Sequence, residues 1–139
     1  NRMAHLLDSD AMRHAFERVC NVKLDTAALR LELCLDSDGF WLEPHTDIGA
    51  TKLTLLISLS TGEGAAELGT DLMTPDGQSV ARASGEFNSA VLFIPSDKTW
   101  HGFVKRPIKG TRRTLIVNFV DQNWRAVHEL AFGPRSVQH

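Results

Sequence analysis

Two histidines and one aspartate in this sequence have the residue types and the spacing of a metal site. The segment Pro44-His45-Thr46-Asp47 contains a histidine and an aspartate two positions apart, and His101 follows far downstream. Two imidazole nitrogens and one carboxylate suit an Fe(II) ion that keeps open coordination positions for reactants. The residues therefore predict a metal site made of His45, Asp47 and His101, and its expected chemistry is that of a non-haem iron oxygenase.

The pair His45 and Asp47 is a weak signal when it is taken alone, because a hydrogen-bonded surface pair has the same residue types. In an extended strand, side chains two positions apart point to the same face, so this pair reaches one metal if the segment is extended. His101 strengthens the prediction because it opens a predicted strand between Trp100 and Gly102. The glycine leaves room beside the imidazole.

The elements that must position these residues are predicted to be mainly β. From Leu31 onward, short runs of strand-forming residues alternate with turns rich in Gly, Pro, Asp and Ser. Residues 74–77 read as a tight hairpin turn. Many short strands at this spacing are typical of a jelly roll. The predicted strands cover residues 31–35, 40–42, 52–59, 71–73, 79–83, 90–94, 100–104 and 114–120.

Two helices are predicted outside the strands. Apolar residues recur at three- and four-residue steps over residues 3–19, which places them along one side of a helix that packs outside the sheet. Residues 122–130 predict a short closing helix, with Asn123 near its start. His5 and His14 lie on the first helix without a suitably spaced carboxylate, so they are interpreted as surface histidines.

The size and charge of the chain limit its organisation and its partners. The sequence has 139 residues, 42% of them hydrophobic, which predicts one domain over residues 1–139. A net charge of −2 and a pI near 6.3 argue against nucleic acid and anionic membranes as partners. The oligomeric state is not defined by the sequence. One basic cluster is interpreted as a solvated edge; it consists of Lys105, Arg106, Lys109, Arg112 and Arg113.

The sequence predicts a cytoplasmic protein without a membrane partner. No apolar run approaches the roughly 20 residues that cross a bilayer, and the first residues do not resemble a secretion signal. Cys20 and Cys34 are too few for a disulfide framework, and their apolar neighbours predict buried, reduced thiols.

Taken together, residues 31–121 resemble the Fe(II)/2-oxoglutarate-dependent dioxygenase superfamily, in particular its prolyl-hydroxylase-like branch. The resemblance implies a double-stranded β-helix core, a form of jelly roll, in which His45, Asp47 and His101 hold Fe(II). It also implies that 2-oxoglutarate and O2 take the remaining coordination positions. The segments that carry it are residues 44–47 with the apolar strand before them, 53–59, 91–95, 100–101 and the strand that begins at Arg112.

The activity that the resemblance implies is hydroxylation. The cosubstrate 2-oxoglutarate is oxidatively decarboxylated to succinate and CO2, and a C–H bond of a small molecule or peptide receives a hydroxyl group. Two alternatives keep the same ligands, namely a zinc hydrolase and a jelly-roll module that binds a metal or a sugar without turnover. The arginine after His101 favours the oxygenase, because a hydrolase has no need of a fixed clamp for a dicarboxylate.

Arg112 and Thr114 are predicted to bind 2-oxoglutarate. Residues 112–120 alternate as a strand, so Arg112 and Thr114 share one face while Arg113 and Leu115 share the other. Hydrophobicity alone would turn Arg113 inward. The family pattern instead places the cosubstrate arginine first in an R-x-S/T pair, and a barrel that binds a polar ligand lines its mouth with polar side chains. We therefore expect Arg112 to face the site.

The sequence departs from the family because it contains no tyrosine, a residue that many relatives place near the cosubstrate. The nearest matching positions are Leu35 and Ser58, and only the serine offers a hydroxyl group. Phe40 and Trp41 are expected either to wall the substrate pocket or to pack in the core. The glycine-rich residues 61–69 are expected to form a flexible rim or an ordinary surface connection.

Overall fold

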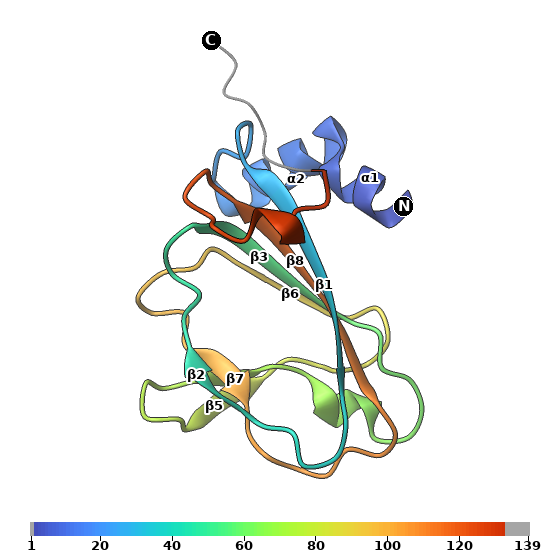
Figure 1. The fold of residues 1–139 in the computed structure, drawn as a ribbon. Helices are drawn as coiled ribbons and strands as arrows, with labels where there is room; N and C mark the ends of the chain where they lie inside the picture. Colours follow the sequence, from blue (N-terminus) through green and yellow to red (C-terminus); the bar gives the residue numbers. More distant parts are fainter. Residues whose placement is uncertain (1, 133–139) are drawn as a thin grey trace.

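The structure, a computed structural model, describes residues 2–132 and is mainly β. Two helices are followed by strands that form two four-stranded antiparallel sheets, an arrangement consistent with a jelly-roll-like sandwich. The helices lie at one end of the molecule, where they meet the end of one sheet (Figure 1). The prediction of a mainly β fold is confirmed. Residue 1 and residues 133–139 of the predicted domain lie outside the described range.

The first sheet has the strand order β1-β8-β3-β6 and carries the longer strands. Its members are β1 (Ala28–Asp36), β3 (Thr51–Ser58), β6 (Ala90–Phe93) and β8 (Arg112–Val120). β1 and β8 are paired over their whole length, from Ala28 opposite Val120 to Asp36 opposite Arg112. This register brings the first and the last of these strands side by side.

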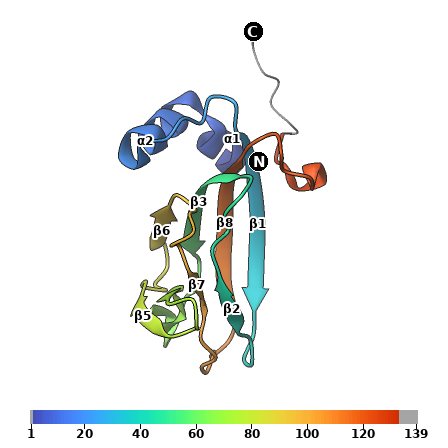
Figure 2. The same cartoon turned by 90° about the vertical axis from the view of Figure 1, so that its left-hand side faces the viewer.

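The second sheet is smaller and has the strand order β2-β7-β4-β5. Its members are β2 (Leu42–His45), β4 (Asp71–Met73), β5 (Ser79–Arg82) and β7 (His101–Phe103). Figure 2 shows this sheet at the end of the first sheet that lies away from the helices. Hydrogen bonds from Gly77 N to Thr74 O (3.0 Å) and from Thr74 N to Gln78 O (2.9 Å) close the hairpin between β4 and β5, as predicted.

The predicted strands are all present, but some of their ends differ. β1 begins at Ala28 rather than at Leu31. The strand predicted over residues 40–42 instead runs from Leu42 to His45, so that Phe40 and Trp41 precede it. The shift matters because it places His45 at the last position of a strand.

The helix predicted over residues 3–19 is divided at Ser9 into α1 (Arg2–Asp8) and α2 (Asp10–Cys20). Ser9 has extended backbone angles, and its Oγ atom accepts a hydrogen bond from Met12 N at 3.3 Å, so it is the N-cap of α2. A serine side chain bonds its local backbone and therefore favours a helix start over a helix interior. Neither helix has the length and the apolar composition of a membrane span, nor does any other in residues 2–132.

The predicted closing helix over residues 122–130 is wrong. The structure has only a 3-10 turn there, η2 (Val127–Glu129). The chain is instead held against the edge of β1, where Arg30 and Leu130 form a β-bridge and Ala131 N donates to Leu29 O at 2.9 Å. Pairing of the backbone with a strand edge has replaced the local hydrogen bonds that a helix would need.

The two faces of the first sheet have opposite character. One face is apolar, and the helices bury part of it: Leu53 and Phe119 are 0% exposed there, next to Phe16 of α2. Beyond the helices this face meets solvent, since Leu33 is 57% and Leu35 61% exposed. The opposite face, which looks toward the second sheet, carries the charged and polar residues of β1 and, except for Arg113, those of β8.

Candidate metal centre

The structure brings His45, Asp47 and His101 together, and ligand atoms of all three lie within 4.8 Å of one another. His45 ends β2 and His101 begins β7, and the two residues are direct partners in the antiparallel ladder. The Oδ1 atom of Asp47 lies 3.5 Å from His45 Nε2, and its Oδ2 atom lies 3.1 Å from His101 Nε2. Cross-strand pairing therefore supplies the two histidines, and the turn after β2 supplies the carboxylate.

The expectation of an extended His45–Asp47 segment is wrong. Asp47 has a φ of 62°, in the left-handed region that residues other than glycine rarely adopt. The preceding peptide is held by Thr99, whose Oγ1 atom donates to Thr46 O at 2.8 Å. The aspartate thus reaches the histidines through a turn, and such backbone strain is often found at functional sites.

Hydrogen bonds to the outer ring nitrogens orient both histidines. Nδ1 lies 3.0 Å from Glu43 O in His45 and 2.7 Å from Thr99 O in His101. Because a carbonyl oxygen only accepts, each Nδ1 carries the proton, and in the neutral imidazole Nε2 is left with its lone pair. Both lone pairs point toward the carboxylate. Three electron-pair donors that converge in this way fit a divalent metal ion, and the Nδ1 bonds are the outer contacts expected of metal-bound histidines.

The electrostatics of the site favour a charged carboxylate. In the protein without a bound metal, burial raises the pKa of Asp47, but a hydrogen bond from His101 and the positive charges of the two histidines in their protonated form and of Arg30 outweigh it, so that the pKa lies below its usual value. Asp47 is therefore ionised at neutral pH, which is the state that binds a metal. His101 is buried, and the Phe93 ring packs edge-on against its imidazole with the two ring centres 4.9 Å apart. His45 is half-buried.

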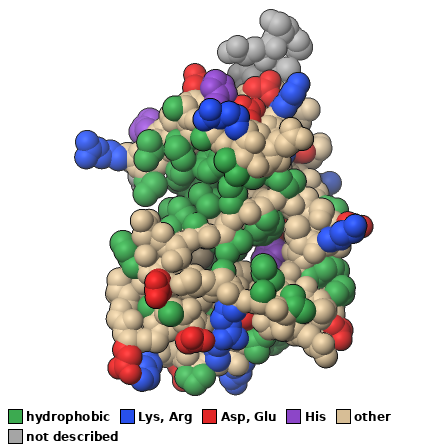
Figure 3. All heavy atoms as spheres, turned by 180° about the vertical axis from the view of Figure 1, so that it is seen from behind, with side chains coloured by type: hydrophobic (Ala, Val, Ile, Leu, Met, Phe, Trp, Pro, Cys, Tyr) green, Lys and Arg blue, Asp and Glu red, His purple; other side chains and the backbone are tan. Residues whose placement is uncertain are grey.

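The three ligands lie at the wall of a cavity of about 540 Å³ between the two sheets. In Figure 3, which views the molecule from behind, a hollow opens in the middle and a histidine side chain is visible at its edge. The cavity takes its polar lining from alternate residues of β1 and β8: Arg30, Glu32, Cys34, Asp36, Arg112, Thr114 and Asn118.

Arg112 faces this cavity and Arg113 does not. Arg112 is 7% exposed and lines the wall with Thr114, while Arg113 is exposed on the other face of β8. The Arg112 guanidinium donates from Nε to Leu68 O (2.8 Å) and from Nη1 to Asp36 Oδ2 (3.0 Å). It also lies 4.5 Å from the centre of the Phe103 ring. A buried cation, held by two hydrogen bonds, thus lies in the same cavity as the three candidate metal ligands.

A second charged group, centred on Arg30, lines the cavity and was not predicted from the sequence. Its guanidinium donates to Asn118 Oδ1 at 2.9 Å, pairs with Glu32 and Glu129, and lies 5.3 Å from the Trp124 ring. The available signal was the alternation of residues 28–36, which places polar side chains at every second position. The alternation did not show which set of side chains faces the interior, because apolar side chains more often do so and here the polar ones line the cavity.

The tyrosine-matched positions do not reach the metal site. Leu35 lies on the outer face of the first sheet, and the Ser58 hydroxyl donates to Gly85 O at 2.6 Å outside the cavity wall. Cys34, the residue before Leu35, does line the cavity. Burial, together with the charges of Glu32 and Asp36, raises the pKa of its thiol to about 11, so the group is a neutral side chain at pH 7.

The structure agrees with some of the remaining sequence interpretations and differs from others. Phe40 lines the cavity, whereas Trp41 is 60% exposed. Both cysteines are free, as predicted, although each is only half-buried. The interpretation of the basic cluster as a solvated edge is wrong for Arg106, which is held by internal hydrogen bonds, and for Arg112. Residues 61–69 contain a short 3-10 helix, η1 (Ala65–Leu68), with buried Ala65 and Leu68.

Replacing Gly102 by alanine is expected to weaken metal binding without removing a ligand. A Cβ atom there would lie 2.6 Å from Leu42 O and 3.0 Å from Glu43 O, both on β2. The added methyl group forces β2 away from β7, and with it His45 away from His101. We expect the dissociation constant for Mn(II), measured by titration calorimetry, to rise about tenfold.

The matched control for this prediction is Leu72→Ala. Leu72 lies opposite His101 on the neighbouring strand β4 and is 39% exposed, so its truncation removes surface atoms and forces no strands apart. This variant should keep the wild-type affinity. If Gly102→Ala also keeps it, close approach of β2 and β7 is not what sets the geometry of the site.

Comparison with known proteins adds one finding about the fold. No family model and no curated protein matches this chain. Among solved structures, it is similar to the crystal structure of a prolyl-4-hydroxylase from Pseudomonas putida, with a TM-score of 0.61 and 16% sequence identity. The similarity covers 84% of this chain and 64% of the neighbour's chain. The structural similarity shows a shared fold, and a sequence identity this low leaves the reaction open.

Proposed function

We propose that this protein is an Fe(II)- and 2-oxoglutarate-dependent dioxygenase that hydroxylates a C–H bond in a small molecule or peptide. The observation that carries the proposal is the placement of His45, Asp47 and His101 in one cavity with the buried Arg112. The similarity to a prolyl-4-hydroxylase structure supports it at the level of the fold. We also propose that the two sheets form the double-stranded β-helix of that superfamily and that the chain is one domain.

In this proposal His45, Asp47 and His101 would hold Fe(II) at the wall of the cavity. Bound iron supplies the activation of O2, by which one oxygen atom enters succinate as 2-oxoglutarate loses CO2 and the other enters the C–H bond. The hydrogen bonds at both Nδ1 atoms keep the Nε2 lone pairs available, and the lowered pKa of Asp47 keeps its carboxylate charged.

Arg112 and Thr114 bind the distal carboxylate of 2-oxoglutarate in the proposed complex. Both are nearly buried and lie on the same face of β8, so a carboxylate between them receives a charge-assisted bond and a hydroxyl bond. Apolar wall residues, among them Leu56, Ile116 and Phe103, limit the access of water. No separate general base is required, because hydroxylation removes a hydrogen atom from the C–H bond and not a proton.

The cosubstrate arginine is what distinguishes this proposal from a zinc hydrolase or a non-catalytic binding module. Hydrolysis at a metal needs no fixed partner for a dicarboxylate, and a binding module consumes no cosubstrate. Because Arg112 is buried and Arg106 is half-buried, only part of the basic cluster lies on the surface, which supports a small-molecule or peptide substrate over nucleic acid.

Anaerobic reconstitution followed by admission of O2 tests the proposal. The protein with Fe(II) and 2-oxoglutarate should develop a visible absorption band before O2 is added and should release succinate afterwards, more rapidly when a panel of metabolites contains the substrate. Zn(II)-loaded protein is the control and should release none. Stoichiometric iron binding without any succinate would rule out the oxygenase and leave the two alternatives.

A further inference from the structure

The orientation of Arg112 depends on the short helix η1. The last residue of η1, Leu68, offers the carbonyl oxygen that accepts from Arg112 Nε at 2.8 Å. Its other neighbours are the Asp36 carboxylate, at 3.0 Å from Nη1, and the Phe103 ring. A change in the position of Leu68 would therefore rotate the guanidinium within the cavity.

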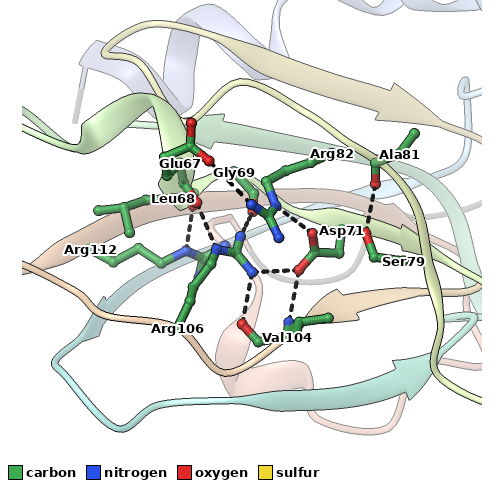
Figure 4. Close-up of polar contacts among 10 residues, drawn as sticks. All are labelled: Glu67, Leu68, Gly69, Asp71, Ser79, Ala81, Arg82, Val104, Arg106 and Arg112. Carbon is green, nitrogen blue, oxygen red and sulfur yellow. Dashed lines mark hydrogen bonds and ion pairs between the residues drawn. The ribbon is translucent and has the colours of Figure 1, made fainter.

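η1 is too short to hold its own position, and Arg106 holds it from outside. A 3-10 helix of 4 residues has few internal hydrogen bonds of poor geometry. Arg106 donates from Nε to Glu67 O at 2.7 Å and from Nη2 to Gly69 O at 2.7 Å (Figure 4). These two carbonyl groups stand directly before and directly after Leu68, so one guanidinium fixes the backbone on both sides of it.

Arg106 is itself fixed by Asp71, whose side chain is fully buried. Asp71 Oδ2 accepts from Arg106 Nη1 at 2.6 Å and from Val104 N at 2.8 Å, and Oδ1 accepts from Arg82 Nε at 2.7 Å and from Ser79 Oγ at 3.2 Å. Burial raises the pKa of Asp71, but the bonds from Arg82, Val104 and Arg106 outweigh it, and the pKa lies below its usual value. The carboxylate is thus charged and has a donor on each side.

The Phe103 ring links the two arginines directly. The Arg106 guanidinium lies 3.7 Å from its centre and the Arg112 guanidinium 4.5 Å from it. The ring is 1% exposed and is fixed in β7. Gly69, directly after η1, lies in close contact with the backbone of Ala83: a Cβ atom on Gly69 would lie 1.8 Å from Ala83 O. This contact prevents Gly69 from moving toward Ala83.

From these contacts we propose that Asp71 and Arg106 are positioning residues for the cosubstrate. They fix η1 so that Arg112, whose Nε and Nη1 atoms already donate to Leu68 O and Asp36, presents its remaining N–H groups to the distal carboxylate of 2-oxoglutarate. The inference rests on the proposed function, in which Arg112 binds that carboxylate. A guanidinium pairs with a carboxylate through two parallel hydrogen bonds, and a small rotation loses one of them. Neither Asp71 nor Arg106 touches the cosubstrate.

Arg82 offers a matched control within the same cluster. It donates to the same Asp71 carboxylate at 2.7 Å, but it touches η1 only through the exposed side chain of Glu67, at 3.2 Å. Arg82→Lys and Arg106→Lys are therefore the same chemical change beside the same buried acid. Both keep a positive charge near Asp71, and only Arg106→Lys releases the carbonyl groups that flank Leu68.

The experiment compares two ligands of Mn(II)-loaded protein by titration calorimetry. Oxalate chelates the metal but has no distal carboxylate for Arg112, whereas 2-oxoglutarate has one. In Arg106→Lys we expect the dissociation constant for 2-oxoglutarate to rise about five- to tenfold, since part of a charge-assisted pair is lost, and that for oxalate to stay unchanged. In Arg82→Lys both constants should match the wild type.

A second variant covers the case in which Arg106→Lys does not fold. Arg106→Gln leaves Asp71 paired with Arg82, and it should show the same selective loss of 2-oxoglutarate while its melting curve remains cooperative. If the ratio of the dissociation constants for 2-oxoglutarate and oxalate is the same in the Arg106 and Arg82 variants, the positioning role is overturned. If Arg112→Ala also leaves that ratio unchanged, Arg112 is not the clamp and the positioning role falls with it, whereas succinate release tests the dioxygenase activity separately.

Discussion

Removing the charge of Asp47 is expected to lower the affinity for Fe(II) at least about 100-fold, because two imidazoles alone hold a labile divalent ion poorly. Asp47→Asn is the informative variant. Asparagine tolerates the left-handed backbone that Asp47 adopts, at a φ of 62°, so the turn should survive the change. Iron content after dialysis, measured by plasma mass spectrometry, reports the loss, and the melting temperature reports whether the fold is retained.

His45→Ala and His101→Ala should lose iron in the same way, since each removes one of the three converging donors. His14→Ala is the matched control, because His14 is an exposed histidine on α2. It should bind iron like the wild type. Stoichiometric iron in any of the three ligand variants would disprove the assignment of the site, and loss of a cooperative melting transition would show that the changed residue is structural.

Replacing Arg112 by alanine is expected to raise the KM for 2-oxoglutarate about tenfold or more, because a charge-assisted contact of this kind contributes roughly 1.5–3 kcal/mol. Iron content should not change, since Arg112 is no ligand. Arg112→Lys should recover little of the loss because an ammonium group cannot form two parallel bonds to a carboxylate. Steady-state succinate release at several 2-oxoglutarate concentrations separates the effect on KM from one on kcat.

Arg113→Ala is the control for this prediction. Arg113 is exposed on the outer face of β8, so its loss should leave the KM for 2-oxoglutarate near the wild-type value. The opposite ranking of the two variants would show that Arg113, on the other face of β8, holds the cosubstrate and that Arg112 does not. Arg112→Ala also removes donors from Leu68 O and Asp36, and its lower melting temperature is expected to accompany the change in KM.

The residues that meet at the candidate metal site and most of the strands could be predicted from the sequence alone. The pair His45 and Asp47 became informative only together with His101, and alternation of side chains together with turn residues is a local property of each strand. Alternation placed Arg112 and Arg113 on opposite faces, and the family resemblance, together with the expectation of a polar cavity mouth, selected Arg112 as the inward one. The end of β2 was misplaced because a strand end depends on its partner, here β7.

Only the tertiary structure decided how these parts meet. The turn at Asp47 replaces the expected extended segment, because Thr99, far away in sequence, holds the preceding peptide. The polar face of β1 became the cavity wall because α1 and α2 cover part of the opposite, apolar face. Arg106 became internal because Asp71 and two backbone carbonyls surround it. Residue types and local periodicity set which chemistry and which elements are available, whereas the register between distant strands sets which side chains lie within bonding distance.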